Sequence, residues 1–199
     1  MDSSQKKGRG RPKSRPREEV VERAVELYWR EGPQNVSLNE LCRRVDVSKP
    51  AFYREFGGED GLAKAVLDYY RAAVVTPVLA FLDQPIPFSD LLAGLIEGMT
   101  ADRGYPPGCL FTEMRMIRRH LGTDTLATLE SMEAERRTAF AKWYEKALAA
   151  GEANPSLSAA DAADYLDSQF TLILLHMGLE RDPDAIRQEA KLALGVLTV

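Results

Sequence analysis

The chain has 199 residues, which fits one large or two small domains, and its two cysteines are too few for a disulfide framework. The formal net charge is −4 but uneven: seven basic side chains against one acidic side chain give residues 1–17 a net +6, which leaves −10 on the rest. This pattern is expected of a protein that contacts a polyanion at one end only, and it argues against indiscriminate nucleic-acid binding by the whole surface.

The first 16 residues predict a disordered basic arm, because they are rich in Lys, Arg, Gly, Pro and Ser and show no apolar period. Within it, the run GRGRPK over residues 8–13 resembles an AT-hook core, an extended segment thin enough for Arg9 and Arg11 to enter a narrow minor groove. A flexible tail that only adds charge and solubility is an equally good interpretation.

Residues 18–31 have the apolar spacing of a helix, and a Gly-Pro pair then ends it. Ser37 and Glu40 follow as a capping-box pattern, in which the hydroxyl accepts a backbone N–H and the Glu side chain reaches back to the cap. One apolar helical face continues to Val45. Asp46 is expected to adopt the left-handed conformation in the turn, since Asp tolerates it better than most residues other than Gly.

A second short helix follows the turn, with Ser48 as its cap, Pro50 in its first turn and Gly57 at its end. In helix-turn-helix proteins the first residues of such a helix enter the major groove. Its outward cations, phenol and hydroxyls suit phosphates and base edges. We predict DNA contacts by Ser37, Ser48, Lys49, Pro50, Phe52, Tyr53 and Arg54. A generic helical hairpin packed in a core is the alternative.

Residues 59–76 predict a linking helix that Pro77 kinks or ends, and any switch between the head and the rest must pass through it. Further helices are expected over residues 88–99, 109–120 and 124–150. Two last helices, capped by Ser158 and Asp182, complete the chain.

The last two helices are apolar on two sides, and in so short a chain the second side is expected to meet another subunit. We predict a two-fold dimer through roughly residues 163–197. Its interface residues are Leu172, Leu175, His176, Leu179, Leu192 and Val196. The alternative is that both helices are simply central in the monomer.

Residues 36–62, with the helix before them, resemble the DNA-binding domain of the tetracycline-repressor (TetR) family. The matching residues are Ser37, Leu41, Val47-Ser48-Lys49, Phe52-Tyr53, Phe56-Gly57 and Leu62. The resemblance is specific over about residues 17–65. It implies an all-helical homodimeric transcription regulator, usually a repressor, that a small molecule releases from DNA. It also implies a ligand pocket, whose candidates are large side chains of the middle helices: Phe81, Leu95, Met99, Phe111, Met114, Trp143, Tyr144 and Phe170.

The sequence lacks the residue patterns of common metal-binding, nucleotide-binding and catalytic sites. His120 and His176 are its only histidines and have no HExxH-type spacing, and no Walker loop or nucleophile elbow occurs, so we expect no metal, no cofactor and no enzyme. No apolar stretch follows the basic N-terminus, and the most apolar run, residues 74–82, is short and contains Pro77. We therefore expect a cytoplasmic protein without a membrane partner.

The sequence thus predicts an all-α fold, with an N-terminal three-helix helix-turn-helix head and a C-terminal helical domain for effector binding and dimerisation. The boundaries are 1–16 for the arm, 17–62 for the DNA-binding domain with the linking helix from about residue 59, and 63–199 for the effector and dimerisation domain. The predicted function is sequence-specific transcription regulation by a homodimer on a near-palindromic duplex, released by an unknown small molecule. The alternatives are an architectural DNA-binding protein without an effector, or a helical small-molecule-binding protein.

Overall fold

The computed structural model describes residues 15–102 and 104–199, so Arg9 and Arg11 of the predicted arm lie outside it. The described part is helical and contains no β-strand, which confirms the all-α prediction. The α-helices are α1 (Arg17–Glu31), α2 (Leu38–Val45), α3 (Lys49–Phe56), α4 (Glu59–Tyr70), α5 (Thr76–Phe81), α6 (Phe88–Thr100), α7 (Leu110–Met116), α8 (Thr123–Ala150), α9 (Ala159–Gly178) and α10 (Pro183–Leu194).

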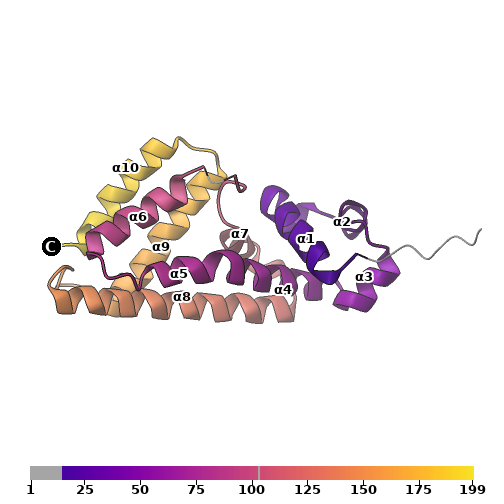
Figure 1. The fold of residues 1–199 in the computed structure, drawn as a ribbon, viewed down its shortest axis with the longest axis horizontal. Coiled ribbons are helices and arrows are strands. Elements are labelled where there is room, and N and C mark those ends of the chain that lie inside the picture. Colours follow the sequence, from indigo (N-terminus) through magenta and orange to yellow (C-terminus); the bar gives the residue numbers. More distant parts are fainter. Residues whose placement is uncertain (1–14, 103) are drawn as a thin grey trace, which may run out of the picture.

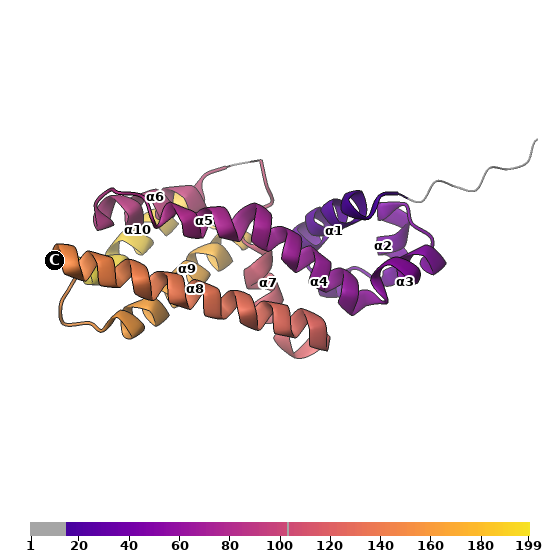
Figure 2. The same ribbon diagram turned by 60° about the horizontal axis from the view of Figure 1, so that its bottom comes forward.

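The molecule is elongated, with α1, α2 and α3 gathered at one end and α6, α9 and α10 at the other (Figure 1). Both views show α4 and α5 running between the two ends with the long α8 beside them (Figure 2). Helix α8 packs against α4 in its first half and against α9 in its second half. No helix of the described residues is both long and apolar enough to cross a membrane.

The linking helix does not end at Pro77. It continues to Phe81, but a π-helical turn, Arg71–Val75, separates α4 from α5, and the N–H of Thr76 donates to the carbonyl of Arg71, five residues back. Proline lacks an N–H, and in an α-helix its ring clashes with the carbonyl four residues earlier. A wider turn directly before Pro77 relieves this clash, so the helix carries on where the sequence suggested a kink or a stop.

The apolar core is divided in two, and the division does not fall between head and body. One cluster joins buried side chains of α1, α2 and α3 to α4, α7 and the first half of α8. The other cluster fills the far end between α6, the second half of α8, α9 and α10. The head therefore shares a continuous core with the nearer half of the body, and α4 lies in the middle of it.

A polar contact also ties the linking helix to the body. The Asp60 carboxylate, in the first turn of α4, accepts the backbone N–H groups of Asp124 and Thr125, each at 3.0 Å, and the Thr125 hydroxyl at 2.5 Å. Asp60 thus caps the start of α8 from another helix. Gly122 makes room for it, because a Cβ there would lie 2.2 Å from the Asp60 carboxyl carbon.

Candidate nucleic-acid interface

Helix α2 begins as predicted, but with half of the expected capping box. The Ser37 hydroxyl accepts the N–H of Glu40 at 3.3 Å. The Glu40 carboxylate does not reach back, because it pairs with the guanidinium of Arg43 one turn later. This ion pair holds the pKa of Glu40 below its usual value, chiefly through the hydrogen bond from Arg43.

The turn between α2 and α3 depends on Asp46, which adopts the predicted left-handed conformation with φ of 59°. Its carboxylate pairs with Arg15 at 3.1 Å, so the chain just before α1 is fastened to the turn. Helix α3 then begins at its predicted cap, where the Ser48 hydroxyl accepts the N–H of Ala51 at 3.4 Å, with Pro50 in the first turn. Gly57 ends the helix with a left-handed backbone, φ 73°.

The outer side of α3 carries two cations, Lys49 and Arg54. Among the described residues, the ion pairs do not include Lys49 or Arg54, and both side chains are exposed. Arg43 and Arg44 of α2 pair instead with Glu40 and Glu31. Lys49 and Arg54 are therefore available to an external anion without an internal pair having to break.

Tyr53 lies beside these cations with 52% of its surface exposed. Its ring meets the edge of Phe52 at a centroid distance of 5.5 Å, which fixes its direction outward. Ser37, Ser48 and Pro50 are exposed at the same end of the head. Six of the seven predicted contacts on these helices are thus open to solvent, as contact with DNA requires.

Phe52 is the exception, and its prediction as a DNA contact is wrong. Its side chain is fully buried, and it packs against Phe56 at a centroid distance of 5.6 Å in the core of the head. A short helix must bury one side to be held at all, and in α3 Phe52 and Phe56 form that side. From the core, Phe52 packs against the ring of Tyr53.

The predicted dimer residues lie on α9 and α10 or just beyond them. Leu192 is 85% exposed and Leu179 65% exposed, and Leu172 and Val196 are exposed as well. Leu175 and His176 are half-buried, and the His176 ring lies 2.7 Å from the Arg181 guanidinium. The second apolar side of these helices is therefore not central in the monomer.

The predicted ligand residues do not gather around one cavity, because they fill two separate cores. Phe111 and Met114 belong to the cluster shared with the head. The rest belong to the far cluster or pack on its edge: Phe81, Leu95, Met99, Trp143, Tyr144 and Phe170. The Tyr144 hydroxyl donates to the backbone carbonyl of Asn154 at 2.9 Å, so it is already bonded within the protein.

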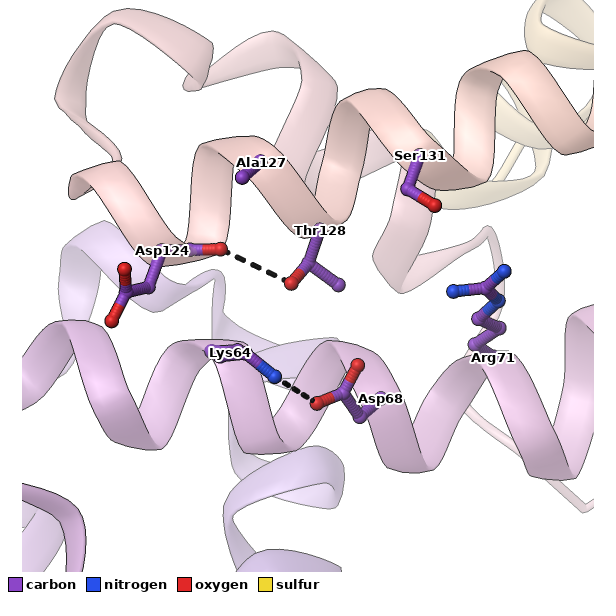
Figure 3. Close-up of a pocket in the computed structure, with 7 residues that line it drawn as sticks. All are labelled: Lys64, Asp68, Arg71, Asp124, Ala127, Thr128 and Ser131. Carbon is purple, nitrogen blue, oxygen red and sulfur yellow. Dashed lines mark hydrogen bonds and ion pairs between the residues drawn. The ribbon is translucent and has the colours of Figure 1, made fainter.

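Two cavities lie elsewhere in the described structure. One, of about 340 Å³, lies between α4 and α8 and is polar (Figure 3). Its two cations are already paired, Lys64 with Asp68 at 2.6 Å and Arg71 with Glu135 at 2.6 Å. The other, of about 350 Å³, lies between α1, the end of α4 and the segment around Tyr105.

Residues 20–66 match the family model described as "Bacterial regulatory proteins, tetR family". This match covers the helix-turn-helix and its flanking helices. The chain belongs to the TetR family. It is therefore a DNA-binding transcription regulator, as the sequence resemblance predicted.

Full-length relatives of this TetR-family protein agree with the match. The chain is 28% identical over 173 residues to the HTH-type transcriptional repressor ComR of Escherichia coli (strain K12), covering 83% of this chain and 82% of ComR. Its fold is similar to that of reduced NemR from E. coli, with a TM-score of 0.79 at 16% identity, over 92% of this chain and 97% of NemR. It is also similar to a CifR cysteine mutant in complex with a 26-bp operator duplex, with a TM-score of 0.78 at 18% identity, over 94% of this chain and all of that one.

Proposed function

We propose that this protein is a homodimeric repressor that reads a near-palindromic operator through α3 and leaves it when a small molecule binds. The repressor role is supported by relatives such as ComR, a transcriptional repressor. Two heads related by a two-fold axis would read half-sites about one helical turn apart, or a multiple of it. Such a protein works in the cytoplasm and catalyses no reaction.

The observation that carries the proposal is the exposed side of α3. Lys49 and Arg54 are exposed without an ion-pair partner among the described residues, on a helix whose own N-terminal N–H is capped by Ser48. Tyr53 adds a rigid aromatic side chain with a polar end. In this role Lys49 and Arg54 contact phosphates or base edges, and Ser37 and Ser48 position the head. Arg9 and Arg11, in the segment outside the described residues, are proposed to add minor-groove contacts.

The DNA interface is tested by selecting duplexes from a random pool with the purified protein and measuring affinity for the winner over a range of salt. Lys49→Ala is expected to weaken binding by about 5- to 100-fold and to reduce the salt slope by about one if Lys49 contacts a phosphate. Tyr53→Ala should weaken binding while leaving the salt slope nearly unchanged. Lys142→Ala removes an exposed lysine of α8 and should change nothing.

Two outcomes would contradict the proposal. If Lys49→Ala and Tyr53→Ala both bind the selected duplex as wild type does, α3 is not the reading helix. If no duplex is enriched and binding is salt-dependent on any sequence, the protein is an architectural DNA-binding protein instead.

The dimer is proposed to form through α9 and α10, whose exposed leucines would otherwise face water. Replacing Leu179 and Leu192 together by Glu places four like charges in a two-fold interface, and sedimentation should show loss of the dimer. Ile86→Glu is the control, since Ile86 is an exposed apolar residue in the loop before α6. A monomeric wild type, or a double variant that stays dimeric, would refute this interface.

A further inference from the structure

Four aromatic side chains are among the residues that line the cavity at the junction of head and body. Helix α1 contributes Trp29, and the end of α4 contributes Tyr69 and Tyr70. Tyr105, on the segment before α7, stacks on Trp29 with a centroid distance of 5.7 Å and an angle of 8° between the rings. Tyr70 meets Trp29 edge-on at 5.0 Å. The volume of about 350 Å³ is in the range of small-molecule sites.

The charge of this cavity is negative. Glu22 and Glu26 of α1 line it, together with Arg30. Arg30 pairs with Glu26 at 3.2 Å, whereas Glu22 has no cationic partner among the described residues. The Tyr69 hydroxyl donates to the Glu22 carboxylate at 3.3 Å and so holds it at the rim of the cavity. Burial and this carboxylate raise the pKa of Tyr69, which keeps the phenol a donor.

Ring faces and an uncompensated carboxylate together select one class of ligand. The faces of Trp and Tyr carry negative quadrupole charge and attract cations. A carboxylate adds Coulomb attraction for the same sign of charge. An anion would meet repulsion from both, and a neutral ligand would gain apolar and stacking contacts with the rings but no charge attraction. We infer that the α1–α4 cavity binds an organic cation of the aryl- or alkylammonium class, held by the aromatic side chains and Glu22.

The position of the cavity gives this binding a consequence, which rests on the proposed function. Its walls come from α1 in the head, from α4 with the following π turn, and from the segment at Tyr105. A cation that fits one spacing of α1 and α4 better than another shifts the head between its orientations. The cation is therefore an effector that weakens binding to the operator.

Direct binding is tested without DNA. The chain has two tryptophans, so Trp143→Phe leaves Trp29 as the only one and makes its fluorescence a probe of the cavity. Benzyltrimethylammonium should change this fluorescence saturably, and benzenesulfonate and benzyl alcohol should bind at least tenfold more weakly. Calorimetry on the wild-type protein gives the same comparison if the Trp143→Phe variant does not fold.

Glu22→Gln should weaken benzyltrimethylammonium by about three- to tenfold, because it removes the charge and keeps the shape. Glu18→Gln removes an exposed carboxylate of the same helix outside the cavity, and its affinity should stay within twofold of wild type. Equal affinity for the cation, the anion and the alcohol, no saturable binding, or no effect of Glu22→Gln would overturn the site.

The effector role is tested on the selected duplex at constant total ionic strength. Benzyltrimethylammonium at ten times its dissociation constant should weaken DNA binding at least threefold. The Glu22→Gln variant should need a cation concentration about three- to tenfold higher than wild type for the same loss of DNA affinity. If the cation binds but DNA affinity is unchanged, the effector inference is refuted. If DNA binding depends on Lys49 but the cation does not bind, the cavity inference fails and the regulator stands. If the cation binds and no duplex is preferred, the proposed function fails and the site stands.

Discussion

Asp60→Ala is expected to destabilise the protein, because the Asp60 side chain of α4 caps the start of another helix, α8. The Asp60 carboxylate accepts two backbone N–H groups and the Thr125 hydroxyl, and it is the only described side chain that takes the first N–H groups of α8. Replacing an N-cap residue by Ala costs about 1–2 kcal/mol. For a chain of this size that corresponds to a fall in melting temperature of roughly 2–8 °C.

The pH dependence of this difference tests the electrostatic part of the argument. Burial opposes ionisation of Asp60, but the hydrogen bonds from Thr125 and Asp124 outweigh it and lower its pKa below 3.8. A carboxyl whose folded pKa is lowered stabilises the protein above its unfolded pKa, and this stabilisation is lost as pH falls through the folded pKa. The difference in free energy of unfolding between wild type and Asp60→Ala should therefore have its full size at pH 7 and become smaller below pH 3.8.

Thermal unfolding of wild type and Asp60→Ala, followed by circular dichroism at pH 3 and at pH 7, measures this difference in stability. The matched control is Asp68→Ala, which removes an exposed carboxylate of the same helix paired with Lys64. Such a surface pair contributes about 0–1 kcal/mol, so the control should shift the melting temperature much less. A gap that is absent at pH 7, or equally large at pH 3 and pH 7, would refute the reasoning.

Two further variants, each with a neighbour as control, test the packing of the body by urea unfolding. Gly108→Ala should lower the free energy of unfolding by about 2–3 kcal/mol, because Gly108 has φ of 82° and a Cβ there would lie 3.0 Å from the backbone of Gly178. The control is Gly178→Ala, whose Cβ would meet nothing closer than 3.8 Å and which should lower it by under about 0.5 kcal/mol. Arg136→Ala should lower the free energy of unfolding by about 3 kcal/mol, because Arg136 is only 6% exposed and its guanidinium pairs with Asp167. The control, Arg137→Ala, breaks only an exposed pair and should lower it by under about 0.5 kcal/mol. Equal losses within either pair of variants would show that the stated contact is not the cause.

Features that depend on neighbours in sequence could be predicted. Ser37, Ser48 and Ser158 cap their helices because a hydroxyl three residues before an N–H is enough to satisfy it. Asp46 takes the left-handed conformation for an equally local reason. The outward side of α3 followed from the same reasoning, apart from Phe52, since spacing within an eight-residue helix does not decide which aromatic residue is buried.

Features that depend on distant contacts could not be predicted. Asp60 stands in the first turn of its own helix, and nothing in the sequence links it to residues 124 and 125. The ligand candidates are large side chains of the middle helices, a property that core residues share with pocket residues, and in the structure they fill two cores. The aromatic cavity joins α1, α4 and the segment at Tyr105, and three separated segments leave no common pattern.

The π-helical turn at Arg71–Val75 sets how α4 is rotated relative to α5. Each residue of an α-helix advances the chain by about 1.5 Å and turns it by about 100°. A π turn contains one residue more than the α-helical turn it replaces. Converting it to α-helix by deleting one of its residues would rotate the segment before it about the helix axis by roughly 100°. The direction in which α3 points therefore depends on one extra residue in the linking helix, as well as on the core that α4 shares with α7 and α8.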